Sequence, residues 1–137
     1  DTITSVIARE RGPMDVRLSE AEWDVMEVLW SSAQPLTATD IDEALRKGDR
    51  DWSLATVKSL LSRLLAKQAV APAKDGRRFL YTPAIERASC VNHESRRFVD
   101  RLFGGRLSPL IVQLANEESL DAEDVAAIER LLREMKS

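Results

Sequence analysis

Three helix-start signatures follow one another in the first half of the chain, and they restrict its fold more than any other feature. Each joins a Ser or Thr N-cap to two flanking apolar residues that can pack on each other across the cap, an arrangement called a hydrophobic staple. Glu22 adds a capping box to the first, because its carboxylate can reach back to the backbone amide of the N-cap residue. The three sets are Leu18, Ser19 and Trp23; Leu36, Thr37 and Ile41; and Trp52, Ser53 and Val57.

The connections between these helices are short. The first helix should run to about Ser31, and the second should stop at Gly48, because glycine readily takes the left-handed conformation that follows a helix end. Only the polar residues 49–51 then precede the third helix. A connection of this length is typical of a helix-turn-helix.

The third helix, residues 52–68, has two different faces. One face repeats apolar residues at the three-and-four spacing of a buried stripe, namely Val57, Leu60, Leu61, Leu64 and Leu65. The other is polar and basic, with groups that can donate hydrogen bonds to phosphates and base edges. We predict that side chains near its start, Thr56 to Ser62, read bases in the major groove, while Arg63 and Lys67 hold phosphates. The DNA-binding candidates on this helix are Ser53, Ala55, Thr56, Lys58, Ser59, Ser62, Arg63 and Lys67.

A β-hairpin should follow the third helix. Residues 70–73 and 77–82 have an extended pattern, and Asp75-Gly76 between them can supply the positive φ values of a tight turn. Phe79 and Tyr81 alternate onto the face expected to pack on the helices. The basic residues around the turn, Lys74, Arg77 and Arg78, are candidates for phosphate or minor-groove contact. Three helices and a two-stranded wing predict a winged helix-turn-helix domain over residues 14–84.

The remainder, residues 85–137, should be a helical dimerisation region, which makes the fold mainly α with a small β-wing. We predict helices from Ala88 to Phe103, from Ser108 with Pro109 at the first helical position, and from an N-cap at Asp121. Short amphipathic helices do not bury their apolar stripes alone, so we expect a homodimer. The dimerisation candidates are Phe98, Leu102, Leu110, Ile111, Leu114, Val125, Ile128, Leu132 and Met135.

The charge of the chain is unevenly distributed. The net charge is only −3, but residues 53–79 hold six basic residues and one acid, while acids dominate residues 116–137. A basic segment inside an acidic chain indicates a local anion-binding surface. The single cysteine excludes an intramolecular disulfide, and no apolar run reaches the roughly 18 residues of a membrane span, so we expect a cytoplasmic protein without membrane insertion. Residues 1–13 have no clear period and are interpreted as an N-terminal extension or an expression remnant.

Catalytic and metal chemistry find little support in the sequence. Cys90 and His93 lie three residues apart on a predicted helix and could both bind one metal ion. A closed metal site usually needs three or four ligands, so we expect neither a metal nor another cofactor. The chain also lacks a nucleophile with a positioned base and a glycine-rich phosphate loop, which indicates a protein that is not an enzyme.

Three stretches resemble a known family. They are Leu18-Ser-Glu-Ala-Glu-Trp-Asp-Val-Met-Glu-Val-Leu-Trp30, Asp51-Trp-Ser-Leu-Ala-Thr-Val-Lys-Ser-Leu-Leu-Ser-Arg-Leu64, and Ser95-Arg-Arg-Phe-Val-Asp-Arg-Leu-Phe-Gly-Gly105. Together with the wing they are similar to the penicillinase repressor family, which includes the BlaI, MecI and CopY regulators. The resemblance covers residues 14–135. It implies a homodimeric transcriptional repressor on a palindromic double-stranded DNA operator, controlling a resistance or stress-response operon.

The resemblance does not carry over an inducing signal. In the β-lactam branch, a membrane sensor protease cuts the repressor at an Asn-Phe pair, and the matching position here is Gln113-Leu114. In the copper branch, paired Cys-x-Cys motifs bind metal, and this chain has none. The alternative to a repressor is a winged-helix module that binds a protein partner and no DNA. Such a module would not need basic residues on both the third helix and the wing.

Overall fold

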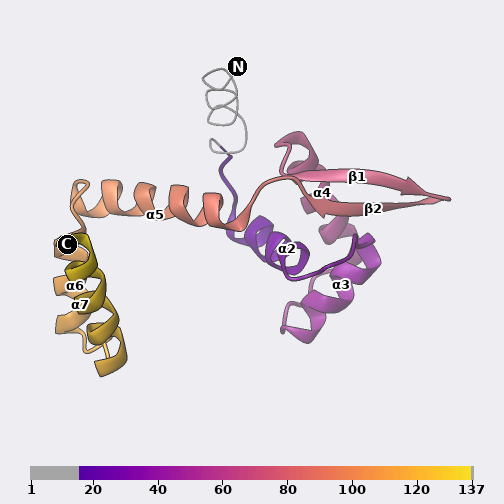
Figure 1. Ribbon diagram of the computed structural model, residues 1–137. Helices are drawn as coiled ribbons and strands as arrows, with labels where there is room; N and C mark the ends of the chain where they lie inside the picture. The colour runs from indigo at the N-terminus through magenta and orange to yellow at the C-terminus, as the bar shows by residue number, and fades with distance from the viewer. Residues whose placement is uncertain (1–15, 137) are drawn as a thin grey trace, which may run out of the picture. The chain divides into compact units, whose positions relative to one another are not determined.

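The computed structural model describes residues 16–136 and confirms the mainly helical fold with a small wing (Figure 1). These residues divide into two compact units, one ending at His93 and the other beginning at Glu94. The interpretation of residues 1–13 lies outside the described part. The elements are α2 (Glu20–Trp30), α3 (Ala38–Lys47), α4 (Leu54–Ala66), β1 (Val70–Asp75), β2 (Arg78–Pro83), α5 (Arg87–Phe103), α6 (Leu107–Asn116) and α7 (Ala122–Lys136).

The three predicted N-caps are confirmed by their hydrogen bonds. The Ser19 hydroxyl accepts from the Glu22 amide at 3.1 Å, and the Glu22 carboxylate accepts from the Ser19 amide at 2.8 Å. Thr37 forms a second capping box at the start of α3. The Ser53 hydroxyl caps α4 by accepting a hydrogen bond from the backbone amide of Thr56, the third residue of that helix. These bonds satisfy amides that have no partner inside their helices, so each helix begins where a local sequence signal places it.

The end of α3 differs from the prediction. Gly48 is the C-cap, but its φ of −94° is not left-handed, and the next residue, Asp49, takes that conformation with a φ of 68°. Aspartate tolerates left-handed backbone better than most residues, because its short side chain can bond locally. The prediction about Gly48 was therefore wrong by one residue, although the helix ends where expected.

The core of the first unit lies between α2, α3 and α4. From α4, Val57, Leu60, Leu61 and Leu64 are at most 4% exposed, which confirms four of the five stripe residues as fully buried, while Leu65 is partly buried. They meet apolar side chains of the other two helices: Val25, Met26, Leu29, Ile41 and Leu45. Burying one face of α4 in this way turns its opposite face towards solvent.

The wing is an antiparallel pair in which Val70 lies opposite Pro83 and Asp75 opposite Arg78. Asp75 thus belongs to β1, and the turn consists of Gly76 and Arg77, of which only Gly76 has a positive φ, at 66°. The turn therefore lies one residue later than the predicted Asp75-Gly76 turn. A turn with glycine at its first central position joins strands without splaying them.

Phe79 and Tyr81 were expected to pack on the helices, and only Tyr81 does. Tyr81 packs against the core, and its backbone exchanges hydrogen bonds of 3.0 and 2.7 Å with Leu36, which adds a short bridge beside β2. Phe79 is 50% exposed, because the hairpin extends past the helices towards its turn (Figure 1). The prediction for Phe79 was wrong.

The second unit consists of the end of α5 with α6 and α7. Gly104 and Gly105 both have positive φ values, 60° and 85°, as expected of residues that end a helix. Asp121 caps α7, since its carboxylate accepts from the Asp124 amide at 2.8 Å. However, α6 begins at Leu107 without a side-chain cap, so the prediction that Ser108 starts the helix and Pro109 holds its first position was wrong.

None of the helices within residues 16–136 has the length and the apolar content that a membrane crossing requires.

Candidate nucleic-acid interface

The polar face of α4 is open to solvent, as its buried stripe requires. Seven of the eight candidates on and beside this helix are exposed: Ser53, Ala55, Thr56, Lys58, Ser59, Ser62 and Arg63. The side chains are short except for two cations, so little bulk would keep the helix from approaching the floor of a DNA groove. The Ser53 and Thr56 hydroxyls lie 3.0 Å apart and share a hydrogen bond at the start of this face.

A groove joins this face to the wing and to the start of α3. Lys58 and Ser62 form one wall, and Arg77 lies on the wing side. The sequence assigned these residues to DNA separately, and the fold brings them to one surface. The complete lining is Thr37, Ala38, Thr39, Lys58, Ser62, Arg77, Arg78, Phe79 and Tyr81.

Thr39 and Phe79 are two residues of this groove that sequence reasoning did not assign to it. Thr39 is exposed in the first turn of α3, where free backbone amides and the positive end of the helix dipole favour anions. Its position after the Thr37 cap was a usable signal, since the start of the first helix of a helix-turn-helix often lies beside the DNA backbone. For Phe79 the alternation of the strand indicated a face, but not how far the core extends beneath it.

The cations of the interface differ in their availability. Within residues 16–136, Lys58, Arg63, Lys74 and Arg77 make no ion pair with a carboxylate. Arg78, in contrast, donates from Nε and Nη2 to one Asp75 oxygen at 3.1 and 2.9 Å. A cation without a protein partner has its full charge available for a phosphate, whereas Arg78 would first have to leave Asp75.

The positive charge of Arg78 also affects a second carboxyl group, that of Asp40. The Thr37 backbone amide, then the Thr37 hydroxyl, hold the pKa of the Asp40 carboxyl below its usual range, and the nearby Arg78 charge adds to this effect. Arg78 therefore interacts electrostatically with Asp40 as well as pairing with Asp75. Of the two wing arginines, Arg77 is the one whose charge is more available.

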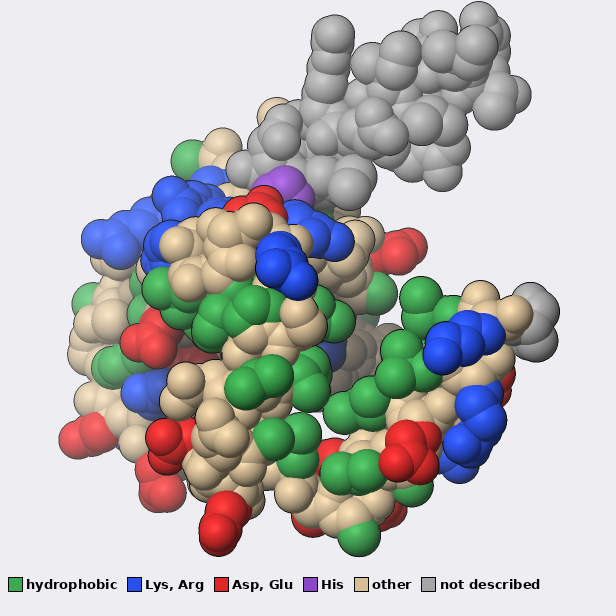
Figure 2. Space-filling model, turned by 90° about the vertical axis from the view of Figure 1, so that its left-hand side faces the viewer, with side chains coloured by type: hydrophobic (Ala, Val, Ile, Leu, Met, Phe, Trp, Pro, Cys, Tyr) green, Lys and Arg blue, Asp and Glu red, His purple; other side chains and the backbone are tan. Residues whose placement is uncertain are grey.

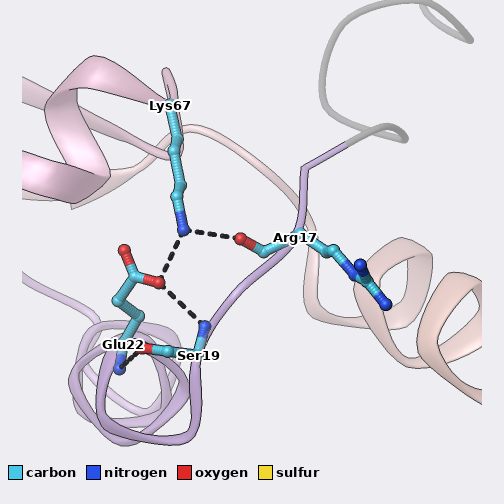
Figure 3. Close-up of polar contacts among 4 residues, drawn as sticks. All are labelled: Arg17, Ser19, Glu22 and Lys67. Carbon is cyan, nitrogen blue, oxygen red and sulfur yellow. Dashed lines mark hydrogen bonds and ion pairs between the residues drawn. The ribbon is translucent and has the colours of Figure 1, made fainter.

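The phosphate role predicted for Lys67 has no support in the structure, because the Lys67 ammonium is already bound within the protein (Figure 3). Its ammonium donates to the Glu22 carboxylate and to the Arg17 carbonyl oxygen, each at 2.6 Å. Glu22 is a charged residue only 1% exposed, and an ion in such a place requires a partner. We therefore remove Lys67 from the interface.

None of the dimerisation candidates is fully buried within the described chain. Neither α6 nor α7 contains a buried residue, and hydrophobic side chains, green in Figure 2, interrupt the polar surface. Among the nine candidates, Leu102 is 54% and Met135 72% exposed, and the others range from half-buried to exposed. Further large apolar residues are exposed on these helices without having been predicted: Leu107, Val112 and Leu131.

The candidate cleavage position and the candidate metal pair both lie within helices. Gln113 and Leu114 belong to α6, and the Gln113 amide reaches Glu117 at 3.4 Å. Cys90 is buried in the core of the first unit, which raises the pKa of its thiol. No cluster of three or more potential ligands was found in the part of the chain that the structure describes, so a metal site has no further support there.

A three-helix bundle, an exposed polar helix face and a basic two-stranded wing around one groove define a winged helix-turn-helix protein. The chain belongs to the penicillinase repressor family, whose model matches residues 18–134.

Individual relatives match over most of their length. The penicillinase repressor of Bacillus licheniformis is 29% identical over 121 residues, which are 88% of this chain and 93% of the relative. The methicillin resistance regulatory protein MecI of Staphylococcus aureus strain N315 is 26% identical over 115 residues, or 84% and 92% of the two chains. A solution structure of Bacillus licheniformis BlaI, a monomeric form in complex with the blaP half-operator, is 34% identical and covers 54% of this chain and 88% of its own, with a TM-score of 0.46.

Proposed function

We propose that this protein is a DNA-binding transcriptional repressor that acts in the cytoplasm as a homodimer on a palindromic operator of a resistance or stress-response operon. One observation carries the proposal. Lys58 of the recognition helix and Arg77 of the wing, which make no ion pair within residues 16–136, line the same groove. Basic residues that gather beside a helix able to enter the major groove indicate a surface that binds duplex DNA. The similarity to the penicillinase repressor of Bacillus licheniformis supports the same function.

Within this interface, the exposed start of α4 would enter the major groove. Thr56 and Ser59 lie near the helix start, where contacts to base edges are usual, and Arg63 lies one turn further along, within reach of the backbone. The groove beside the wing would hold the adjoining DNA backbone. There Lys58, Arg77 and the Thr39 hydroxyl can bind phosphate oxygens, while Phe79 packs on a sugar.

A second copy of the chain is the partner that we propose for α6 and α7. Their exposed apolar stripes would be buried in a symmetric pairing, and each exposed methylene so covered favours association. Dimerisation would also place two recognition helices on one duplex. Analytical ultracentrifugation should then give the mass of two chains, and a stable monomer at micromolar concentration would refute this part.

A membrane sensor protease is the inducing partner that the resemblance offers, and its target would be Gln113-Leu114. Because this bond lies inside α6, a protease would require the helix to open locally before cleavage. Coexpression with a sensor protease encoded beside this gene should give a fragment ending at Gln113 by mass spectrometry. An intact chain under inducing conditions would exclude proteolytic control.

The DNA proposal is tested with a duplex selected from a random pool by the parent protein. Lys58→Ala and Arg63→Ala should weaken binding in fluorescence anisotropy, whereas Lys136→Ala, which removes a cation from the end of α7, should not. Binding should also weaken steeply as salt rises, because phosphate contacts release counterions. If no duplex can be selected, the chain is instead a winged-helix module that binds protein.

A further inference from the structure

The junction of Glu22, Lys67 and Arg17 joins the beginning of α2 to the end of the recognition helix. Lys67 is the C-cap residue of α4, and Glu22 is the third residue of α2, 45 positions earlier in the sequence. Figure 3 shows both the Glu22 carboxylate and the Arg17 carbonyl turned towards the Lys67 ammonium. Through this one cation, two chain segments that are distant in sequence meet at a single point.

Glu22 gives that point a fixed position. Its Oε1 accepts from the Ser19 amide at 2.8 Å as well as from Lys67, so the carboxylate is held by the capping box of its own helix. Its Oε2 is buried and has no hydrogen-bond partner among the described residues. The only ion pair of Glu22 in the described chain is with Lys67. Loss of Lys67 would therefore leave a carboxylate of 1% exposure without compensation.

Lys67 is also well placed to hold the end of α4. A cation at a helix C-terminus interacts favourably with the helix dipole, and the following residue, Gln68, turns the chain away with a φ of 61°. The Lys67 side chain is partly buried, with an exposure of 37%. The ammonium is directed to α2, and Lys67 is not one of the residues that line the groove with Lys58 and Arg77.

We infer that Lys67 and Glu22 are a positioning pair that fixes the end of the recognition helix against α2 and so sets the angle at which α4 meets DNA. The inference rests on the proposed function. It separates Lys67 from Lys58, although both are basic residues of the same helix. Lys58 acts on the duplex, whereas Lys67 acts through the orientation of α4.

Three variants test the pair: Lys67→Met, which keeps the apolar stem, Glu22→Gln, which keeps the capping acceptor, and the double variant. Their affinities for the selected duplex are measured at a temperature at which circular dichroism shows every variant folded. Lys67→Met should weaken binding about twofold to 150-fold, the range that couplings between contacting residues span. The double variant should recover most of the loss, because it removes the uncompensated carboxylate.

The salt dependence distinguishes a positioning residue from a phosphate ligand. Lys67→Met should leave the slope of log affinity against log salt unchanged, while the control Lys58→Met should lower it by about 0.9 for each half-site. A lower slope in Lys67→Met, with no recovery in the double variant, would make Lys67 a phosphate ligand and overturn the inference. Parent-like affinity of Lys67→Met would overturn it as well.

Hydrogen exchange supplies a readout that needs no DNA. Amides in the last turn of α4 should exchange faster in Lys67→Met than in the parent and return towards parental rates in the double variant. Equal exchange in all variants would refute the positioning role. If the parent selects no duplex, the proposed function fails, and the exchange result still decides whether the pair fixes the end of α4.

Discussion

Replacing Arg77 by alanine should affect DNA binding more than the same change at Arg78, although the two residues are adjacent at the tip of a basic hairpin. Arg77 has no ion pair within the described chain and lines the groove with Lys58. Arg78 is bound through two nitrogens to Asp75, so part of its charge is already neutralised. Each phosphate contact contributes about 0.9 to the slope of log affinity against log salt, which gives about 1.8 for Arg77 in the two half-sites of a dimer.

Fluorescence anisotropy with the selected duplex over a series of salt concentrations would measure both slopes. Arg77→Ala should lower the slope by about that amount and weaken binding at every salt concentration. Arg78→Ala should change the slope by less than half as much, because Asp75 holds the Arg78 guanidinium and so limits its contact with phosphates. Asp75→Ala is the matched control, since it releases Arg78 and should strengthen binding. Equal slopes for the two arginine variants would refute the reasoning from their partners.

Three further outcomes follow from burial, charge and exposure. Leu64→Ala, at a site of 0% exposure, should lower the free energy of unfolding by about 2–5 kcal/mol in urea denaturation, and a loss like that of a surface variant would contradict the proposed core. Hydrogen bonds from Arg87 hold the pKa of Glu27 below its ordinary 4.5, so the stability that this carboxylate adds is complete above that pH and declines as the pH falls below it. Thermal melts of Glu27→Gln should therefore show a smaller loss of melting temperature at acid pH than the parent protein. An unchanged loss would refute the role of the pair. Leu132→Glu should shift the sedimenting species towards one chain, while Arg130→Glu, on another face of α7, should leave it unchanged; the reverse pattern would place the contact elsewhere.

Local signals predicted the parts of this fold that depend on neighbours in sequence. The caps at Ser19, Thr37 and Ser53 lie where expected, because each needs only a backbone amide two or three residues away. The apolar stripe of α4 could also be predicted from the sequence, since helical periodicity alone selects which face is buried. The candidate DNA-binding face was then predicted as the opposite side of the helix.

The errors arose where the deciding contact is distant or depends on shape. Nothing near Lys67 in the sequence reveals that Glu22 is its partner, so its charge was assigned to DNA together with that of Arg63. Alternation placed Phe79 on the same face as Tyr81, but only the fold shows that the helices end before they reach it. At Gly48 and Ser108, residue preference selected the right region and missed the position by one residue.

The arrangement of the wing has a consequence for how copies of the chain can associate. A hairpin with free edges can recruit a strand from another molecule. The proposed DNA-bound dimer would bring two such hairpins onto one duplex. On β2, the backbone of Tyr81 is already joined to Leu36, which closes that edge at its centre. On β1, Pro72 lies opposite Tyr81 and has no amide hydrogen to offer the open edge, and Lys74 adds a charge beside it. Both edges of the hairpin thus disfavour strand addition, which agrees with the proposal that the chain self-associates through the helices of the second unit.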